Sequence, residues 1–161
     1  MRLSIIIPVY NVEKYISRCL ESLCHQSLSQ NDYEILIVND GSTDNSVAIA
    51  NQYVDKYANF KLIDKENGGV GSARNKGIAE AKGNYIYFID PDDYLATNLL
   101  KILLDYADNY SLEILTFSTK KTLESNLTKS YTKHIKNLTL KVSTGIEYIA
   151  CLLYTSPSPR D

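Results

Sequence analysis

Two kinds of hydrophobic pattern alternate along the first part of the chain. Residues 3–9 and 34–38 are dominated by isoleucine, leucine and valine, which is typical of strands covered on both faces in a parallel sheet. Shorter apolar runs at 60–63, 85–89 and 112–117 predict three further strands. Strands separated by helical patterns of about a dozen residues form βαβ crossovers. The sequence therefore predicts an α/β protein with a mostly parallel open sheet and helices on both faces.

The segments between the strands repeat apolar residues at helical spacing. The first stripe comprises Tyr15, Ile16, Cys19, Leu20, Leu23 and Cys24, and the second comprises Val47, Ala50, Val54 and Tyr57. A third helix is predicted from about 70 to 81, and a fourth on the leucines of 99–107. We expect Asn11 to cap the first helix and Ser42 or Thr43 to cap the second.

The composition excludes several classes of protein. The chain has 161 residues, of which 44% are apolar and 22% charged, and this suits one globular domain. A net charge of −2 excludes sequence-independent binding to nucleic acid. The sequence contains no run of about 18 apolar residues, the length needed to span a bilayer. The three cysteines lack the CxxC spacing of a zinc or redox site, so we expect reduced thiols and a cytoplasmic location.

Polar residues gather directly after the predicted strands. The segments in question are Pro8–Asn11, Asn39–Asp44, Asp64–Gly69 and Asp90–Asp93. In open parallel sheets, ligands bind outside the carboxyl ends of the strands. We therefore expect one rim of the sheet to bring several carboxylates together at a binding site.

Asp90, Asp92 and Asp93 offer hard oxygen ligands with no histidine or cysteine beside them. Neighbouring carboxylates repel unless a cation compensates. This donor set favours Mg²⁺ or Mn²⁺, which complete their coordination with water and phosphate oxygens. The cluster thus indicates a pyrophosphate-bearing ligand. The alternative is a solvated turn in which Asp93 caps the next helix.

Asp40 lies in the sequence Asn-Asp-Gly-Ser-Thr-Asp after the second predicted strand. Its carboxylate could accept the imide N–H of a pyrimidine base, since that bond needs an acceptor. Lys65 and Arg74 are the cations expected to reach the same crevice. The alternative for this segment is ordinary turn chemistry, with Gly41 supplying a permissive backbone. Arg74 could equally lie on a helix face.

Two better-known nucleotide motifs do not apply. Residues 69–74 superficially match the dinucleotide fingerprint, but Arg74 replaces its third glycine and the loop follows the third strand. A GxxxxGK[ST] phosphate loop is absent from the sequence. His25 and His134 have no partner motif, so no catalytic histidine is assigned.

Four motifs in order, at residues 4–11, 38–44, 67–75 and 90–93, together resemble glycosyltransferase family 2. The resemblance covers about residues 1–118. It implies the GT-A fold and the transfer of a sugar from a nucleotide-diphosphate donor with inversion, using Mn²⁺ or Mg²⁺ at an Asp-x-Asp motif. UDP-sugars are the favoured donors, and dTDP-sugars present the same imide edge.

The resemblance also implies roles for single residues. The nucleotide-binding residues are Pro8, Tyr10, Asn11, Asp40, Ser42, Lys65, Asn67, Gly68, Arg74 and Asp90. The metal ligands are Asp92, Asp90 and Asp93. Inverting transfer also needs a general base, which in this family lies well beyond the metal motif. We expect it beyond the present C-terminus, so no catalytic residue is assigned.

The resemblance divides the chain into three parts. Residues 1–118 are the nucleotide-sugar-binding half, and 119–150 begin an incomplete acceptor-side region. Residues 151–161 resemble a translated sequencing adapter, so we expect a non-native tail on a gene fragment, with a native disordered end as the alternative. Two hypotheses apply to the lysine-rich stretch 120–141. Either it contacts anionic lipid headgroups or a lipid-linked acceptor, or it is a solvated face.

The sequence thus predicts an inverting glycosyltransferase of cell-surface polysaccharide synthesis. Its acceptor would be a glycan or a lipid-linked molecule at the inner face of the cell membrane. As given, the chain would bind nucleotide and metal without transferring sugar. A rival from another class, a sugar nucleotidyltransferase, would need a Gly-rich, basic first loop where this chain has Pro8–Asn11.

Overall fold

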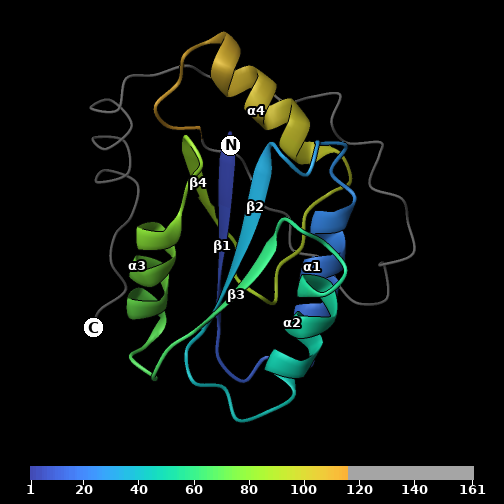
Figure 1. Cartoon of the computed structure of the whole chain (residues 1–161). Helices are drawn as coiled ribbons and strands as arrows, with labels where there is room; N and C mark the ends of the chain where they lie inside the picture. The colour runs from blue at the N-terminus through green and yellow to red at the C-terminus, as the bar shows by residue number, and fades with distance from the viewer. Residues whose placement is uncertain (116–161) are drawn as a thin grey trace, which may run out of the picture. The chain divides into compact units, whose positions relative to one another are not determined.

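The computed structural model describes residues 1–115 (Figure 1). Strands and helices alternate along this part of the chain. In order they are β1 (Leu3–Val9), α1 (Ile16–Cys24), β2 (Tyr33–Asn39), α2 (Ser46–Val54), β3 (Phe60–Asp64), α3 (Val70–Glu80), β4 (Tyr85–Phe88) and α4 (Leu99–Asn109). The first compact unit is Met1–Leu104, and a second begins at Asp105. Every contact of the site described below lies within the first unit.

The four strands form one parallel sheet in the order β3-β2-β1-β4. β1 lies at the centre, with Leu3 paired to Tyr33 of β2 on one side and to Tyr85 of β4 on the other. Figure 1 shows α1 and α2 on one face of the sheet and α3 on the other. This arrangement confirms the predicted α/β fold with helices on both faces of a parallel sheet.

Burial on both faces explains the apolar character of β1. Ile5, Ile6 and Ile7 are all 0% exposed. Ile5 and Ile7 pack with the buried stripe of α1, and Ile6 packs on the opposite face with Ala73 of α3. Since alternate side chains of a strand point to opposite faces, a central strand between two helical layers has no position left for a polar side chain facing water.

Gly77 sets how closely α3 approaches the sheet. A Cβ atom built at this position would lie 2.4 Å from Cγ2 of Ile6. We expect Gly77→Ala to lower the free energy of unfolding by about 1–3 kcal/mol, because an extra methyl group overpacks this contact. Gly71→Ala in the same helix is the matched control, since a Cβ there meets nothing within 4 Å.

Urea denaturation of the two variants measures this prediction. Gly71→Ala should leave stability unchanged or raise it by about 0.5–1 kcal/mol, because alanine is the better helix former. A Gly77→Ala variant as stable as Gly71→Ala would show that α3 does not lie against Ile6 as described.

The predicted helix caps are wrong. α1 begins at Ile16, after Tyr15, so Asn11 does not cap it. α2 begins at Ser46, after Asn45, so neither Ser42 nor Thr43 is its cap. In both places the loop is longer than the local sequence suggests, because the side chains of Asn11 and Ser42 bond across to the other loop rather than to the nearest helix.

Three further expectations need correction. Tyr15, assigned to the apolar stripe of the first helix, is 45% exposed. Asp93 is no helix cap, because α4 begins at Leu99. Residues 112–115, where a fifth strand was expected, form none, and 116–117 lie outside the described residues. Within residues 1–115, no helix is long and apolar enough to cross a bilayer.

Candidate functional site

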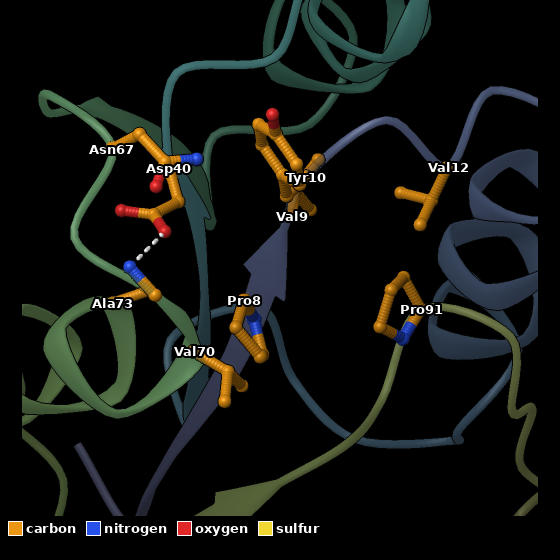
Figure 2. A pocket seen from close by; sticks show the side chains of 10 residues that line it. Pro8, Val9, Tyr10, Val12, Asp40, Asn67, Val70, Ala73 and Pro91 are labelled. Carbon is orange, nitrogen blue, oxygen red and sulfur yellow. Dashed lines mark hydrogen bonds between the residues drawn. The ribbon is translucent and has the colours of Figure 1, made fainter.

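A pocket of about 340 Å³ lies at the carboxyl ends of β1 and β2. Its lining residues are Pro8, Val9, Tyr10, Val12, Asp40, Asn67, Gly69, Val70, Ala73 and Pro91. Figure 2 shows Asp40 and Asn67 on one side of this pocket and Val12 and Pro91 on the other. Most of the wall is apolar, so the pocket suits an organic group that also needs one or two polar contacts.

Asp40 is the charged residue of the pocket wall, and it is only 2% exposed. Its Oδ1 accepts hydrogen bonds from Lys65 Nζ and from the N–H of Gly68, the latter at 3.0 Å. Its Oδ2 accepts the N–H of Gly69 at 2.7 Å, the bond drawn as a dashed line in Figure 2. Asp40 therefore holds the whole loop between β3 and α3 against the end of β2.

These contacts keep the Asp40 carboxylate ionised. The hydrogen bond from Lys65 is the main cause that lowers its pKa below the ordinary value; burial opposes this, and the Gly68 and Gly69 N–H groups add to the lowering. An ionised carboxylate has about four acceptor positions, and these three donors use three of them. Among the described residues, about one acceptor position, on Oδ2, is left without a donor.

The loop that Asp40 holds depends on a left-handed backbone at Gly69, where φ is 83°. Non-glycine residues rarely adopt this conformation. Gly69 immediately precedes the first residue of α3, so this turn both starts the helix and presents its N–H to Asp40. The second glycine of the pair, Gly69, is thus explained by the geometry of the pocket wall.

Acid should weaken the fold through Asp40 and Asp44. Burial alone would raise the pKa of Asp44, but hydrogen bonds from Ser46 and from the Glu13 N–H outweigh it and lower the pKa. A carboxyl group whose pKa is lower in the folded than in the unfolded state stabilises the fold at pH values above its pKa in the unfolded chain, which is about 3.9 for aspartate. This stabilisation is lost as the pH falls through the pKa of the folded state.

Urea unfolding of the chain at pH 6 and at pH 3 measures this effect. We expect a lower midpoint at pH 3, and a smaller drop in an Asp40→Asn variant, because asparagine does not titrate. An equal drop in both proteins would mean that Asp40 contributes nothing to the acid sensitivity.

The loops after β1 and β2 are joined by side chains. The Thr43 N–H donates to Asn11 Oδ1 at 2.8 Å, and the Asn11 N–H donates to Ser42 Oγ at 3.2 Å. The Asn45 N–H donates to Glu13 Oε2 at 2.9 Å. Asn11 and Ser42, both predicted to bind nucleotide, therefore lie together beside the pocket and join the two loops that form its rim.

Arg74 and Asp90, both predicted to contact the nucleotide, pair with each other. Arg74 Nη2 donates to Asp90 Oδ1 at 2.8 Å, and the two side chains are 38% and 51% exposed. The Arg74 guanidinium also lies 5.8 Å from the centre of the Phe88 ring. An exposed ion pair of this kind contributes little stability, so Arg74 can exchange Asp90 for another anion at small cost.

The three predicted metal ligands lie in one turn, closed by the Asp93 N–H bonding to the Asp90 carbonyl at 2.9 Å. Burial, and then the charges of Asp92 and Asp90, raise the pKa of Asp93 above its ordinary value. This mutual repulsion is what a bound cation would relieve. The side chains do not converge, however: within residues 1–115 no group of three acidic, histidine or cysteine side chains is arranged to hold a metal ion.

The donor chemistry of Asp92 and Asp93 nevertheless fits Mg²⁺ or Mn²⁺. Such ions are commonly held by one or two carboxylates, with substrate phosphates and water filling the other positions. Both side chains are exposed, and Pro91, between Asp90 and Asp92, lines the pocket. A ligand in the pocket could therefore extend a phosphate group towards this turn.

The structure places the predicted site residues in five groups. Pro8, Tyr10, Asp40 and Asn67 line the pocket. Lys65 and Gly68 donate hydrogen bonds to Asp40, and Asn11 and Ser42 lie in the joined loops. Arg74 pairs with Asp90, and Asp92 and Asp93 lie in the turn that follows Asp90. Prediction from sequence missed the apolar lining, namely Val9, Val12, Gly69, Val70, Ala73 and Pro91. Each of these residues lies within two positions of a predicted site residue. Their proximity to the motifs was therefore the feature of the sequence that could have identified them.

The chain belongs to glycosyltransferase family 2, whose sequence profile, described as "Glycosyl transferase family 2", matches residues 4–154. The glycosyltransferase EpsJ of Bacillus subtilis, which is uncharacterized, is 46% identical over 111 residues, covering 69% of this chain and 32% of EpsJ. The poly(ribitol-phosphate) beta-glucosyltransferase of Bacillus spizizenii is 50% identical over 102 residues, covering 62% of this chain and 16% of that protein. The chain thus spans at most about a third of the length of these two relatives.

Solved structures agree with this assignment. The crystal structure of residues 1–349 of TarS from S. aureus, in complex with UDP-GlcNAc, matches with a TM-score of 0.66 and 36% identity, over 69% of this chain and 32% of that one. A mannosyltransferase from Pyrobaculum calidifontis, in complex with GDP-Man and Mn²⁺, matches with a TM-score of 0.57 at 22% identity, which supports the fold alone. These matches confirm the predicted GT-A fold.

Predictions for residues 119–161 stay predictions. The acceptor-side region 119–150, the lysine-rich stretch 120–141 and the tail 151–161 all lie outside the described residues. The general base expected beyond the C-terminus is likewise untested.

Proposed function

We propose that this chain is the donor-binding part of an inverting glycosyltransferase that uses a UDP-sugar or a dTDP-sugar. The observation that carries the proposal is the Asp40 carboxylate, which lines a mostly apolar pocket, is held ionised by its hydrogen bonds, and has about one acceptor position on Oδ2 that the described donors leave unused. The imide N–H of uracil or thymine is a donor of the kind this position needs. Family membership and the TarS complex with UDP-GlcNAc support the same choice.

The pocket wall determines which base it accepts. Pro8 and Tyr10 supply apolar surface for the flat faces of a base, and Asp40 supplies the acceptor at its edge. Cytosine has nearly the same shape as uracil, but it carries an unprotonated ring nitrogen where uracil carries the imide N–H. A carboxylate opposite that nitrogen would face a second acceptor, so the site should reject cytosine.

The diphosphate would lie between Arg74 and the turn of Asp90–Asp93. Asp92 and Asp93 are the residues that would hold Mg²⁺ or Mn²⁺, with Asp90 beside them. The ion, when bound, neutralises the negative charge that develops on the departing diphosphate. Arg74 would release Asp90 and donate to the phosphate oxygens, since its guanidinium pairs with phosphate as readily as with carboxylate.

The biological role proposed is cell-surface polysaccharide synthesis. Its support is the similarity to the poly(ribitol-phosphate) glucosyltransferase of Bacillus spizizenii and to TarS. The acceptor would be a glycan or a lipid-linked molecule, met at the cytoplasmic face of the membrane. The reduced cysteines and the lysine-rich stretch 120–141 are the sequence features that favour this location.

Calorimetric titration of the 161-residue chain with four nucleotides tests the proposal. In the presence of Mn²⁺ we expect UDP and dTDP to bind, and CDP to bind at least about tenfold more weakly, because one charge-assisted hydrogen bond is lost. GDP controls for base size. Equal affinities for UDP and CDP would refute recognition of the imide, and the absence of binding by a folded sample would refute the donor site.

A further inference from the structure

The loop that carries Asp92 and Asp93 is held by one helix. It runs from β4 to α4 past α1 (Figure 1) without regular structure. Arg18, Ser22 and Gln26 face it from α1 and from the residues just after α1, at helical spacing. All three contact the loop through its main chain or through Tyr94, and none of them bonds to a carboxylate of the loop.

Arg18 holds the loop at its acidic end. Its Nη2 donates to the main-chain carbonyl of Asp92 at 3.3 Å, and its guanidinium lies 4.7 Å from the centre of the Tyr94 ring. One planar group thus contacts the residues on both sides of Asp93. Arginine can donate and stack at the same time because its guanidinium is planar, and lysine cannot.

Gln26 holds the loop at its other end and is only 1% exposed. Its Nε2 donates to the carbonyl of Ala96 at 3.0 Å and to the carbonyl of Ser22 at 2.7 Å, while its Oε1 accepts the N–H of Leu100 at 3.0 Å. Ser22 Oγ accepts the N–H of Leu95 at 3.0 Å. Both N–H groups and the oxygen of the buried amide are therefore bonded. The loop is held by α1 and the residues just after it at Asp92 and again at Leu95 and Ala96.

We propose that Arg18 and Gln26 are positioning residues that fix the main chain of residues 92–96, so that only the side chains of Asp92 and Asp93 have to move to hold a divalent cation. The inference rests on the proposed function, because it presupposes a cation at this loop. Carboxylates close in sequence repel one another, and an irregular loop yields to that repulsion unless it is held. Contacts that support ligand residues raise metal affinity by removing the cost of ordering them.

The test measures how much Mn²⁺ strengthens UDP binding. The dissociation constant for UDP is determined with Mn²⁺ and again with EDTA, and the ratio of the two values is the metal gain. Arg18→Lys is the main variant, because it keeps the positive charge and Arg18 is exposed. Gln26→Leu is the second variant and changes no charge. Gln52→Leu, on the exposed side of α2, is the matched control.

We expect the metal gain to fall by about tenfold in Arg18→Lys and in Gln26→Leu, as is usual when residues supporting metal ligands are changed. The affinity for UDP in EDTA should stay within about twofold of the wild type, because the base pocket is untouched. Gln52→Leu should match the wild type in both conditions. Circular dichroism identifies any variant that has lost its fold. If Gln26→Leu has lost its fold, the result for Arg18→Lys decides whether the positioning role holds.

The outcomes separate this inference from the proposed function. If the wild type shows a clear metal gain and the variants show the same gain, the positioning role is overturned while the metal site stands. A general loss of UDP affinity in EDTA as well would show a merely structural role for α1, which also overturns it. A wild type that binds UDP without any metal gain overturns both the positioning role and the metal site, and a wild type that binds no UDP overturns the proposed function.

Discussion

Asp40→Asn is expected to lower the free energy of unfolding by about 3–5 kcal/mol, the usual result of breaking one side of a buried ion pair. Asp40 and Lys65 pair with side chains that are only 3% and 17% exposed. Asparagine can accept on one side only, so its NH₂ group would face either the Lys65 and Gly68 donors or the Gly69 N–H. The loop that forms one wall of the pocket would therefore lose its anchor.

The same variant should weaken UDP binding by about 100-fold, because a hydrogen bond donated to a charged acceptor contributes up to about 3 kcal/mol. Binding of inorganic pyrophosphate should change much less, since Asp40 would contact only the base. Urea denaturation and calorimetry measure the two effects. Asp55→Asn, at the exposed end of α2, is the control and should shift stability by no more than about 0.5 kcal/mol. An Asp40→Asn variant that keeps wild-type stability and UDP affinity would contradict the account of the pocket.

Asp92→Ala is expected to remove the strengthening of UDP binding by Mn²⁺ while leaving the metal-free affinity unchanged. The reason is that a hard oxygen ligand is lost, whereas the base pocket is not altered. Because Asp92 is exposed, the fold should keep its stability within about 0.5 kcal/mol. Titrations in Mn²⁺ and in EDTA measure the change, with Asp55→Ala as the control. An undiminished Mn²⁺ effect would remove Asp92 from the metal site.

The strands were the most predictable part of the fold. The bounds predicted for the first strand, 3–9, agree with β1, because a central strand buried on both faces leaves a continuous apolar run. α3 was also predicted within one residue at its end. The starts of α1 and α2 were not, because the side chains of Asn11 and Glu13 bond to residues 32 positions away. No local rule for caps includes such partners.

The candidate site was predictable in its residues but not in its contacts. The motif after β2 singled out Asp40, but its partners Lys65, Gly68 and Gly69 come from the loop after β3, at least 25 positions away. Nothing in the sequence indicated that Lys65, expected to reach a ligand, also bonds to Asp40. Gln26 gave no signal in the sequence, because a lone glutamine after a helix is common, and only the fold shows that it is buried against the 92–100 segment.

A crystal structure of the chain with UDP and Mn²⁺ tests the central claim most directly. The account predicts the uracil ring between Pro8 and Tyr10, its imide nitrogen about 3 Å from Asp40 Oδ2, and an anomalous manganese signal beside Asp92. Uracil bound away from Asp40, or Asp40 contacting only its own loop while UDP occupies the pocket, would contradict the claim that this carboxylate recognises the base.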